Sequence, residues 1–253
     1  MTGRLEGKTA IVTGAARGTG AAIARRFVEE GATVVVADVL DDRGAETATA
    51  IGATYRHLDV TQEADWAAAL GALGGPLDVL VNNAAVLHLA TIDLTTRAAF
   101  ERVLQVNLIG AFLGTQAALP ALRASKGCIV NVGSIDSVHG TALTSAYTAS
   151  KFAMRGLTKV TALENAHFGV RANIVCPAAG NREMHPKIVG AENWPELPES
   201  DGRGPEAVAP AVVYFASEES RLCNGTELVL DAGQTAGQAI PLPDTLYGIG
   251  VTA

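Results

Sequence analysis

Four residues in the middle of the chain have side chains that can hold or move a proton: Asn107, Ser134, Tyr147 and Lys151. Tyr147 and Lys151 are four positions apart in a stretch that predicts a helix, so their side chains project from one face. A free tyrosine has a pKa near ~10, too high for efficient proton transfer at neutral pH. An ammonium group one helical turn away favours the phenolate and lowers that pKa. We therefore expect Tyr147 to exchange a proton with a substrate.

Ser134 and Asn107 are of types that support such a proton transfer. Ser134 directly follows an apolar run, and its hydroxyl can hydrogen-bond a carbonyl or alcohol oxygen and orient it. Asn107 lies in a long helical stretch, where its amide could hold a water linked to Lys151. Each residue also has an ordinary structural alternative: a plain helix face for Tyr147 and Lys151, a strand end for Ser134, and a satisfied buried amide for Asn107.

A glycine-rich turn with Gly14, Gly18 and Gly20 follows the first apolar run and precedes a helical pattern. Glycines there permit a tight turn and let the backbone approach a pyrophosphate, which then meets the helix N-terminus. We expect Arg17 and Thr19 to take part in this site. The alternative is a purely structural turn.

The second predicted strand ends at Asp38, eighteen residues after Gly20. A carboxylate there accepts hydrogen bonds from ribose hydroxyls and repels a 2′-phosphate. Its neighbours Val39 and Leu40 offer no cation to hold that phosphate, so the sequence favours NAD(H) over NADP(H). A solvated acid at a strand end is the structural alternative.

Short apolar runs alternate with longer amphipathic stretches along the whole chain. Such a pattern predicts an α/β fold: a doubly wound parallel sheet with helices on both faces. The predicted strands are 8–13, 33–37, 54–58, 77–81, 127–132, 170–176 and 227–230. The predicted helical stretches are 18–30, 41–51, 61–73, 95–125, 145–168 and 205–217. We expect one catalytic domain over 1–253, with a substrate lid at about 177–204 and a tail at 234–253.

The spacing Gly14-x3-Gly18-x-Gly20, together with Asn82-Asn83-Ala84-Ala85 and Asp59-Val60, resembles the classical short-chain dehydrogenase/reductase family. The resemblance runs from Gly7 to about Gly233. It implies a single-domain Rossmann-type sheet of about seven strands and identifies Asn107, Ser134, Tyr147 and Lys151 with the catalytic tetrad of the family. The cofactor contacts that it implies, besides the glycine turn, are Asp38, Val39, Asp59, Val60, Asn83, Ala84, Ala85, Tyr147, Lys151, Pro177 and Gly180.

The activity that this resemblance implies is hydride transfer between a nicotinamide and a substrate carbon, with Tyr147 giving or removing the proton. One segment departs from the family, because Pro177-Ala178-Ala179-Gly180-Asn181-Arg182 stands where Pro-Gly-x3-Thr is common. We expect a backbone contact near Gly180. Arg182 either reaches the cofactor phosphates or the substrate, or has no role.

The substrate pocket should be formed by the loop after Ser134 and by the lid. We expect it to include Ser134, Asp136, His139, Leu143, Tyr147 and Met184. Asp136 and His139 either recognise a polar group or only shape the loop. The run Ala142–Tyr147, the lid and the tail resemble the bacterial 3α,20β-hydroxysteroid dehydrogenase branch, which is NAD-linked and tetrameric. This favours a secondary alcohol or ketone that is bulky or cyclic, including steroid-like rings.

Two alternative functions remain from the sequence. One is a reductase of 3-oxoacyl thioesters or polyketide-type ketones, which usually goes with NADPH, so Asp38 argues against it. The other is an NAD-binding regulator without turnover: the complete tetrad argues against it, and the altered segment Pro177–Arg182 keeps it open.

Composition excludes several classes of partner. The 253 residues include 26 acidic and 19 basic side chains, and no basic cluster suited to a nucleic acid stands out. The uncharged stretch Val103–Leu122 has the length of a membrane span, but it contains polar residues and a proline, so we expect a buried or interface helix and no membrane. The polar N-terminus and three widely spaced cysteines favour a cytoplasmic protein without a metal site. Apolar surface on Val103–Leu122 and Ser145–Phe168 favours a homotetramer or homodimer.

Overall fold

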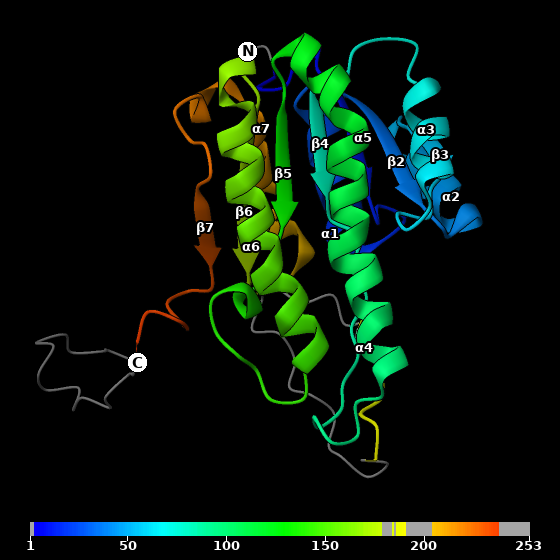
Figure 1. The fold of residues 1–253 in the computed structure, drawn as a ribbon. Coiled ribbons are helices and arrows are strands. Elements are labelled where there is room, and N and C mark those ends of the chain that lie inside the picture. Colours follow the sequence, from blue (N-terminus) through cyan, green and yellow to red (C-terminus); the bar gives the residue numbers. More distant parts are fainter. Residues whose placement is uncertain (1–2, 179–183, 185, 191–203, 238–253) are drawn as a thin grey trace, which may run out of the picture.

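Seven parallel strands form one sheet in the order β3-β2-β1-β4-β5-β6-β7 (Figure 1). The computed structural model describes residues 3–178, 184, 186–190 and 204–237. The strands are β1 (Thr9–Thr13), β2 (Thr33–Asp38), β3 (Thr54–His57), β4 (Val79–Asn82), β5 (Cys128–Val132), β6 (Arg171–Pro177) and β7 (Glu227–Leu230). Every predicted strand overlaps an observed one, and the prediction of a doubly wound parallel sheet is confirmed.

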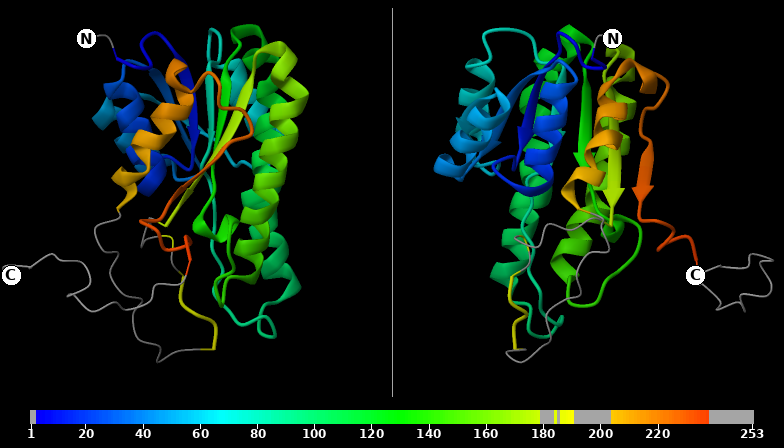
Figure 2. Two further views of the ribbon diagram at one scale, coloured as in Figure 1. Left: turned by 90° about the vertical axis from the view of Figure 1, so that its left-hand side faces the viewer. Right: turned by 180° about the vertical axis from the view of Figure 1, so that it is seen from behind.

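Helices cover both faces of this sheet, which lies between two helical layers in Figure 2. One layer contains α1 (Gly18–Glu29), α2 (Asp41–Ile51) and α7 (Ala209–Ala216), and the other contains α3 (Glu63–Gly71), α5 (Gly110–Ser125) and α6 (Ser145–Asn165). Successive strand residues alternate between the two cores: Val34 and Val36 join the first, and Val35 joins the second. Both faces are therefore buried, which is why the strands read as continuous apolar runs.

The predicted helical stretch 95–125 is not one regular helix. It consists of α4 (Arg97–Leu104), a π-helical turn η1 (Gln105–Ile109) and α5. The sequence gives no sign of this turn, because neither proline nor glycine marks its start. Among the described residues, Arg97–Ser125 is the one helix with the length and composition of a membrane span. Its inner face packs on the sheet core, where Ala118 and Leu122 are fully buried and Gly114 leaves room for the Trp66 ring. This packing favours a core helix.

The carboxyl ends of all seven strands lie at one edge of the sheet, and the lower ends of α4 and α6 extend beyond it (Figure 1). Strand order reverses between β1 and β4, so the connections after these two strands diverge and leave a crevice at that edge. Most of the predicted lid at 177–204, and the predicted tail beyond residue 237, lie outside the described residues. The single-domain assignment stays a prediction.

Candidate active site

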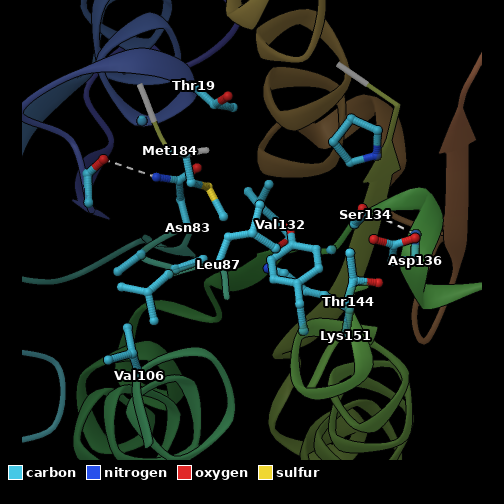
Figure 3. Close-up of a pocket in the computed structure, with 18 of the residues that line it drawn as sticks. Thr19, Asn83, Leu87, Val106, Val132, Ser134, Asp136, Thr144, Lys151 and Met184 are labelled. Carbon is cyan, nitrogen blue, oxygen red and sulfur yellow. Dashed lines mark hydrogen bonds between the residues drawn. The ribbon is translucent and has the colours of Figure 1, made fainter. Parts of the chain in front are cut away.

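A cavity of about 540 Å³ opens at this carboxyl edge (Figure 3). Ser134, Asp136, Thr144 and Lys151 lie on one side of it, and Asn83 lies on the other. The predicted site residues that line it are Gly14, Arg17, Thr19, Gly20, Asp38, Val39, Asp59, Val60, Asn83, Ala84, Ala85, Ser134, Asp136, Leu143, Tyr147, Lys151, Pro177 and Met184. The fold thus brings nearly all of the predicted residues to one continuous cavity.

The glycine turn after β1 has no room for a side chain at Gly14 or Gly20. A Cβ atom on Gly14 would lie 2.7 Å from the Cα atom of Ala84, and one on Gly20 would lie 2.2 Å from the carbonyl oxygen of Gly14. Gly14 also has a φ of +64°, a conformation that favours glycine. The Asn83 amide donates to the carbonyl oxygens of Thr13 (2.8 Å) and Gly14 (3.1 Å) and holds the turn against β4.

The N-terminus of α1 follows this turn. Gly18 does not line the cavity itself, but its φ of +56° turns the chain into the helix. The N-cap residue is Arg17, and its side chain makes no capping hydrogen bond to the first N–H groups of the helix. Thr19 and Gly20 in the first turn of the helix line the cavity. An uncapped helix N-terminus with closely approaching glycine backbone fits the pyrophosphate of a dinucleotide.

Asp38 lies at the end of β2 with its carboxylate held by backbone. Its Oδ2 accepts from the N–H of Ala16 (2.9 Å), and its Oδ1 accepts from those of Val39 (2.8 Å) and Leu40 (3.1 Å). A carboxylate has about four acceptor positions, so these bonds leave capacity for one further donor from the cavity that Asp38 lines. The residues present therefore fit an adenosine ribose.

Tyr147, Ser134 and Lys151 meet where β5 ends against α6. The Ser134 Oγ accepts from the backbone N–H of Asp136 (3.1 Å), and the same hydroxyl hydrogen-bonds Tyr147. Lys151 is buried, its Nζ donates to the carbonyl oxygen of Val132 (2.8 Å), and Nζ lies 5.5 Å from the centre of the Tyr147 ring. One of three ammonium hydrogens is used by Val132, which leaves two for other partners.

Burial governs the titration of this pair. It raises the pKa of Tyr147 well above the usual value of 10, although the hydrogen bond with Ser134 acts in the opposite direction. It also lowers the pKa of Lys151 to about 8. Lys151 is not among the groups that shift the pKa of Tyr147 here, so the expectation that its ammonium lowers that pKa stays a prediction.

Asn107 is completely buried in the π-helical turn and does not line the cavity. Its Nδ2 donates to the carbonyl oxygen of Val86 (3.0 Å) and to the Ser150 Oγ (3.1 Å), and its Oδ1 accepts from the N–H of Val86 (2.8 Å). Both amide hydrogens are thus committed, and the side chain ties the segment after β4 to α6. The water linked to Lys151 stays a prediction.

The substrate end of the cavity has apolar walls and one acidic group. Its apolar lining includes Leu87, Leu89, Ala142, Leu143, Met184 and Ile188. Asp136 is 7% exposed and accepts a hydrogen bond from the Thr141 hydroxyl; burial raises the pKa of its carboxyl.

His139 is not among the residues that line the cavity, so its place in the substrate pocket stays a prediction. Its Nδ1 contacts the carbonyl oxygen of Gly140 (3.0 Å), so the ring turns into its own loop. Gly180 and Arg182 lie outside the described residues.

Sequence reasoning missed several lining residues, namely Leu87, Leu89, Arg102, Val106 and Ile188. Arg102 and Val106 are four apart and so lie on one helix face, but nothing in the sequence indicates that this face meets the cavity. Leu87 and Leu89 carry no local signal beyond their position after Asn83.

The carboxyl edge of this doubly wound sheet combines a glycine turn, an acid that fits a ribose and a Ser–Tyr–Lys group. This combination is typical of a nucleotide-dependent oxidoreductase. Residues 8–193 match the family model described as short chain dehydrogenase. The chain belongs to the short-chain dehydrogenase/reductase family, whose members use a nicotinamide cofactor, and it is an oxidoreductase that acts on an alcohol.

Known proteins resemble the chain over nearly its whole length. A 3-alpha-(or 20-beta)-hydroxysteroid dehydrogenase of Mycobacterium tuberculosis is 44% identical, with 94% of each chain covered. A cyclopentanol dehydrogenase of Comamonas testosteroni is 37% identical, covering 92% of this chain and 99% of the relative. The crystal structure of a putative gluconate dehydrogenase from Agrobacterium tumefaciens superposes with a TM-score of 0.84 at 27% identity, covering 92% of this chain and 98% of that one.

Proposed function

We propose that this protein is an NAD(H)-dependent oxidoreductase that interconverts a bulky or cyclic secondary alcohol, steroid-like rings included, and its ketone. The proposal rests above all on one observation: Tyr147, Ser134 and Lys151 meet in a cavity whose other end contains the Asp38 carboxylate.

The roles of the reacting residues follow from their contacts. Ser134 accepts a hydrogen bond from Asp136, and the hydrogen that it shares with Tyr147 can turn to the substrate oxygen and orient it. Tyr147 gives its proton to that oxygen in reduction and removes it in oxidation. Lys151 keeps two hydrogens for the nicotinamide ribose and for a proton path. The bound nicotinamide supplies or accepts the hydride.

The preference for NAD(H) rests on Asp38. Its carboxylate cannot turn away from the cavity, because backbone N–H groups of Ala16, Val39 and Leu40 hold both oxygens. A 2′-phosphate would therefore be brought against a fixed negative charge.

The substrate class rests on the apolar walls around Tyr147 and on the relatives that act on a hydroxysteroid or on cyclopentanol. The test is the oxidation of NADH and NADPH by the purified protein with cyclopentanone, cyclohexanone, steroid ketones and a 3-oxoacyl thioester. We expect turnover with NADH and a cyclic ketone. Turnover with the thioester and NADPH alone would overturn the proposal in favour of the thioester reductase.

We also propose a homotetramer or homodimer that covers the outer faces of α5 and α6. Phe112, Phe152 and Leu163 on these helices are 42%, 42% and 78% exposed. Light scattering on the purified protein measures the mass, and a monomer at micromolar concentration would contradict this assembly. A cytoplasmic location stays a prediction.

A further inference from the structure

The Asp136 carboxylate is a buried acid at the substrate end of the cavity, beside the reacting hydroxyls (Figure 3). Its backbone N–H donates to the Ser134 Oγ at 3.1 Å. Asp136 therefore lies next to the hydroxyl that orients the substrate oxygen. The residue is 7% exposed, yet it lines the cavity. The substrate and the acid therefore share one space.

The hydrogen-bonding capacity of this carboxylate is largely unused within the described part of the chain. One oxygen, Oδ1, accepts from the Thr141 hydroxyl, and no ion pair with Asp136 is formed there. A buried carboxylate with one donor is costly unless further donors complete it. Polar residues such as Ser134, Thr144 and Lys151 also line the cavity, but in the described structure none of them donates to the Asp136 carboxylate, so a further donor has to come from the contents of the cavity.

The charged neighbours indicate what kind of donor fits. Lys151 and His139 act on Asp136 through their charges, and Asp136 in turn disfavours the phenolate of Tyr147. A cationic substrate group would be repelled by the Lys151 ammonium, and an anionic one would be repelled by Asp136 itself. A neutral donor, such as a hydroxyl, satisfies the carboxylate without either repulsion.

We propose that Asp136 determines substrate specificity by accepting a hydrogen bond from a second hydroxyl of the substrate, so that the enzyme prefers a cyclic diol or hydroxyketone over the corresponding simple alcohol or ketone. This inference rests on the proposed function of the site. The apolar walls hold the ring, Ser134 and Tyr147 hold the reacting oxygen, and Asp136 holds the second one.

The test compares cyclohexanol, 1,2- and 1,3-cyclohexanediol and their mono-methyl ethers as substrates with NAD⁺. The methyl ether keeps the second oxygen but removes its hydrogen. We expect kcat/KM to be about 10- to 100-fold higher for at least one diol than for cyclohexanol and for its own ether, since a hydrogen bond to a charged group is gained. Asp136→Asn should bring these ratios close to one.

The matched control is Thr141→Val, which removes the internal partner of Asp136 but leaves its charge. If Asp136 only shapes its loop through Thr141, both variants lower kcat/KM for all substrates alike, and the inference is wrong. If it binds a hydroxyl, Thr141→Val keeps the preference for the diol. Equal turnover of cyclohexanol and the diols overturns the inference alone, whereas absence of turnover with these alcohols and with steroid alcohols overturns the proposed function and this inference with it.

Discussion

Both ends of the cavity contain left-handed backbone, at glycines in one end and at a leucine in the other. At the cofactor end, Gly14 and Gly18 have positive φ, and Gly14 has no space for a Cβ atom. At the substrate end, Leu143 has a φ of +73°, and its side chain lines the cavity. The carbonyl oxygen of Leu143 accepts from the N–H of Ala90 (3.0 Å), which helps hold this strained backbone.

The difference shows what each end must present to its ligand. At Gly14 and Gly20 the cofactor end presents backbone, so a side chain is excluded there and glycine is required. The substrate end presents a side chain, and a strain of about 1 kcal/mol or more is tolerated to place it. Substitutions that add atoms should therefore change the stability most at the cofactor end. At the substrate end, substitutions that remove atoms should reveal the strain.

The largest effect should come from Gly14→Ala, which should destabilise the protein by about 4 kcal/mol from strain and overlap with Ala84. NADH binding should weaken in parallel. The matched control is Gly52→Ala, because Gly52 has a similar φ of +72° but nothing within 4 Å of an added Cβ. Urea unfolding should give a cost of only about 1 kcal/mol there. Equal costs would contradict the claim that close packing, rather than φ alone, requires glycine at Gly14.

Lys151→Met tests the junction between the two ends. The pKa of Lys151 falls from 10.5 to about 8 on folding, so the folded state binds the proton less well than the unfolded state. The resulting destabilisation is complete below pH 8 and fades as the pH rises toward 10.5. Lys151→Met removes this destabilisation but also loses the hydrogen bond to Val132. The variant should therefore be about 2 kcal/mol more stable than wild type at neutral pH.

This gain should shrink in unfolding experiments as the pH rises above 8. Lys159→Met is the control, since Lys159 lies on the same helix and donates to a backbone carbonyl oxygen (3.3 Å) but is exposed. A gain of the same size and pH dependence in the control would show that burial of Lys151 is not the cause.

Asp38→Asn should lower the preference for NAD⁺ over NADP⁺, measured as the ratio of kcat/KM values, by about tenfold through loss of charge repulsion. Asp42→Asn makes the same charge change on the exposed start of α2, away from the cavity lining. It should leave the ratio unchanged. An unchanged ratio in Asp38→Asn would remove the basis for the NAD(H) assignment.

The smallest effect concerns Leu143. At an ordinary helix or strand position, glycine is less stable than alanine by about 0.5–1 kcal/mol. At Leu143 the order should reverse, because alanine keeps the strain and glycine removes it. Thermal unfolding of Leu143→Gly and Leu143→Ala decides this. Alanine being the more stable of the two would show that the leucine is unstrained.

Most of the fold was readable from the sequence because both faces of the sheet are covered. The buried strand β2 contains the unbroken apolar run Val34–Ala37, β5 is interrupted only by Asn131, and glycines at 31 and 52 mark helix ends. The π-helical turn was not readable, since it depends on side-chain bonds of Asn107 to Val86 and Ser150, which lie far away in the sequence.

The residues of the site were readable from the sequence, whereas their titration and some of their orientations were not. The glycine turn and Asp38 follow from local spacing, and the structure places them as expected. The titration of Tyr147 and Lys151 was not readable from the sequence, because burial decides it and burial is a property of the packed molecule. The orientation of His139 likewise depends on its own loop.

The central claim is that Tyr147 moves the proton in the cavity that also binds the cofactor. The most direct test is kcat/KM of wild type and Tyr147→Phe with a cyclic ketone and NADH, alongside NADH affinity from fluorescence titration. We expect a loss of at least about a thousandfold in kcat/KM, within the range of general acid–base catalysis, with NADH affinity nearly unchanged. Near-normal turnover by Tyr147→Phe would contradict the account.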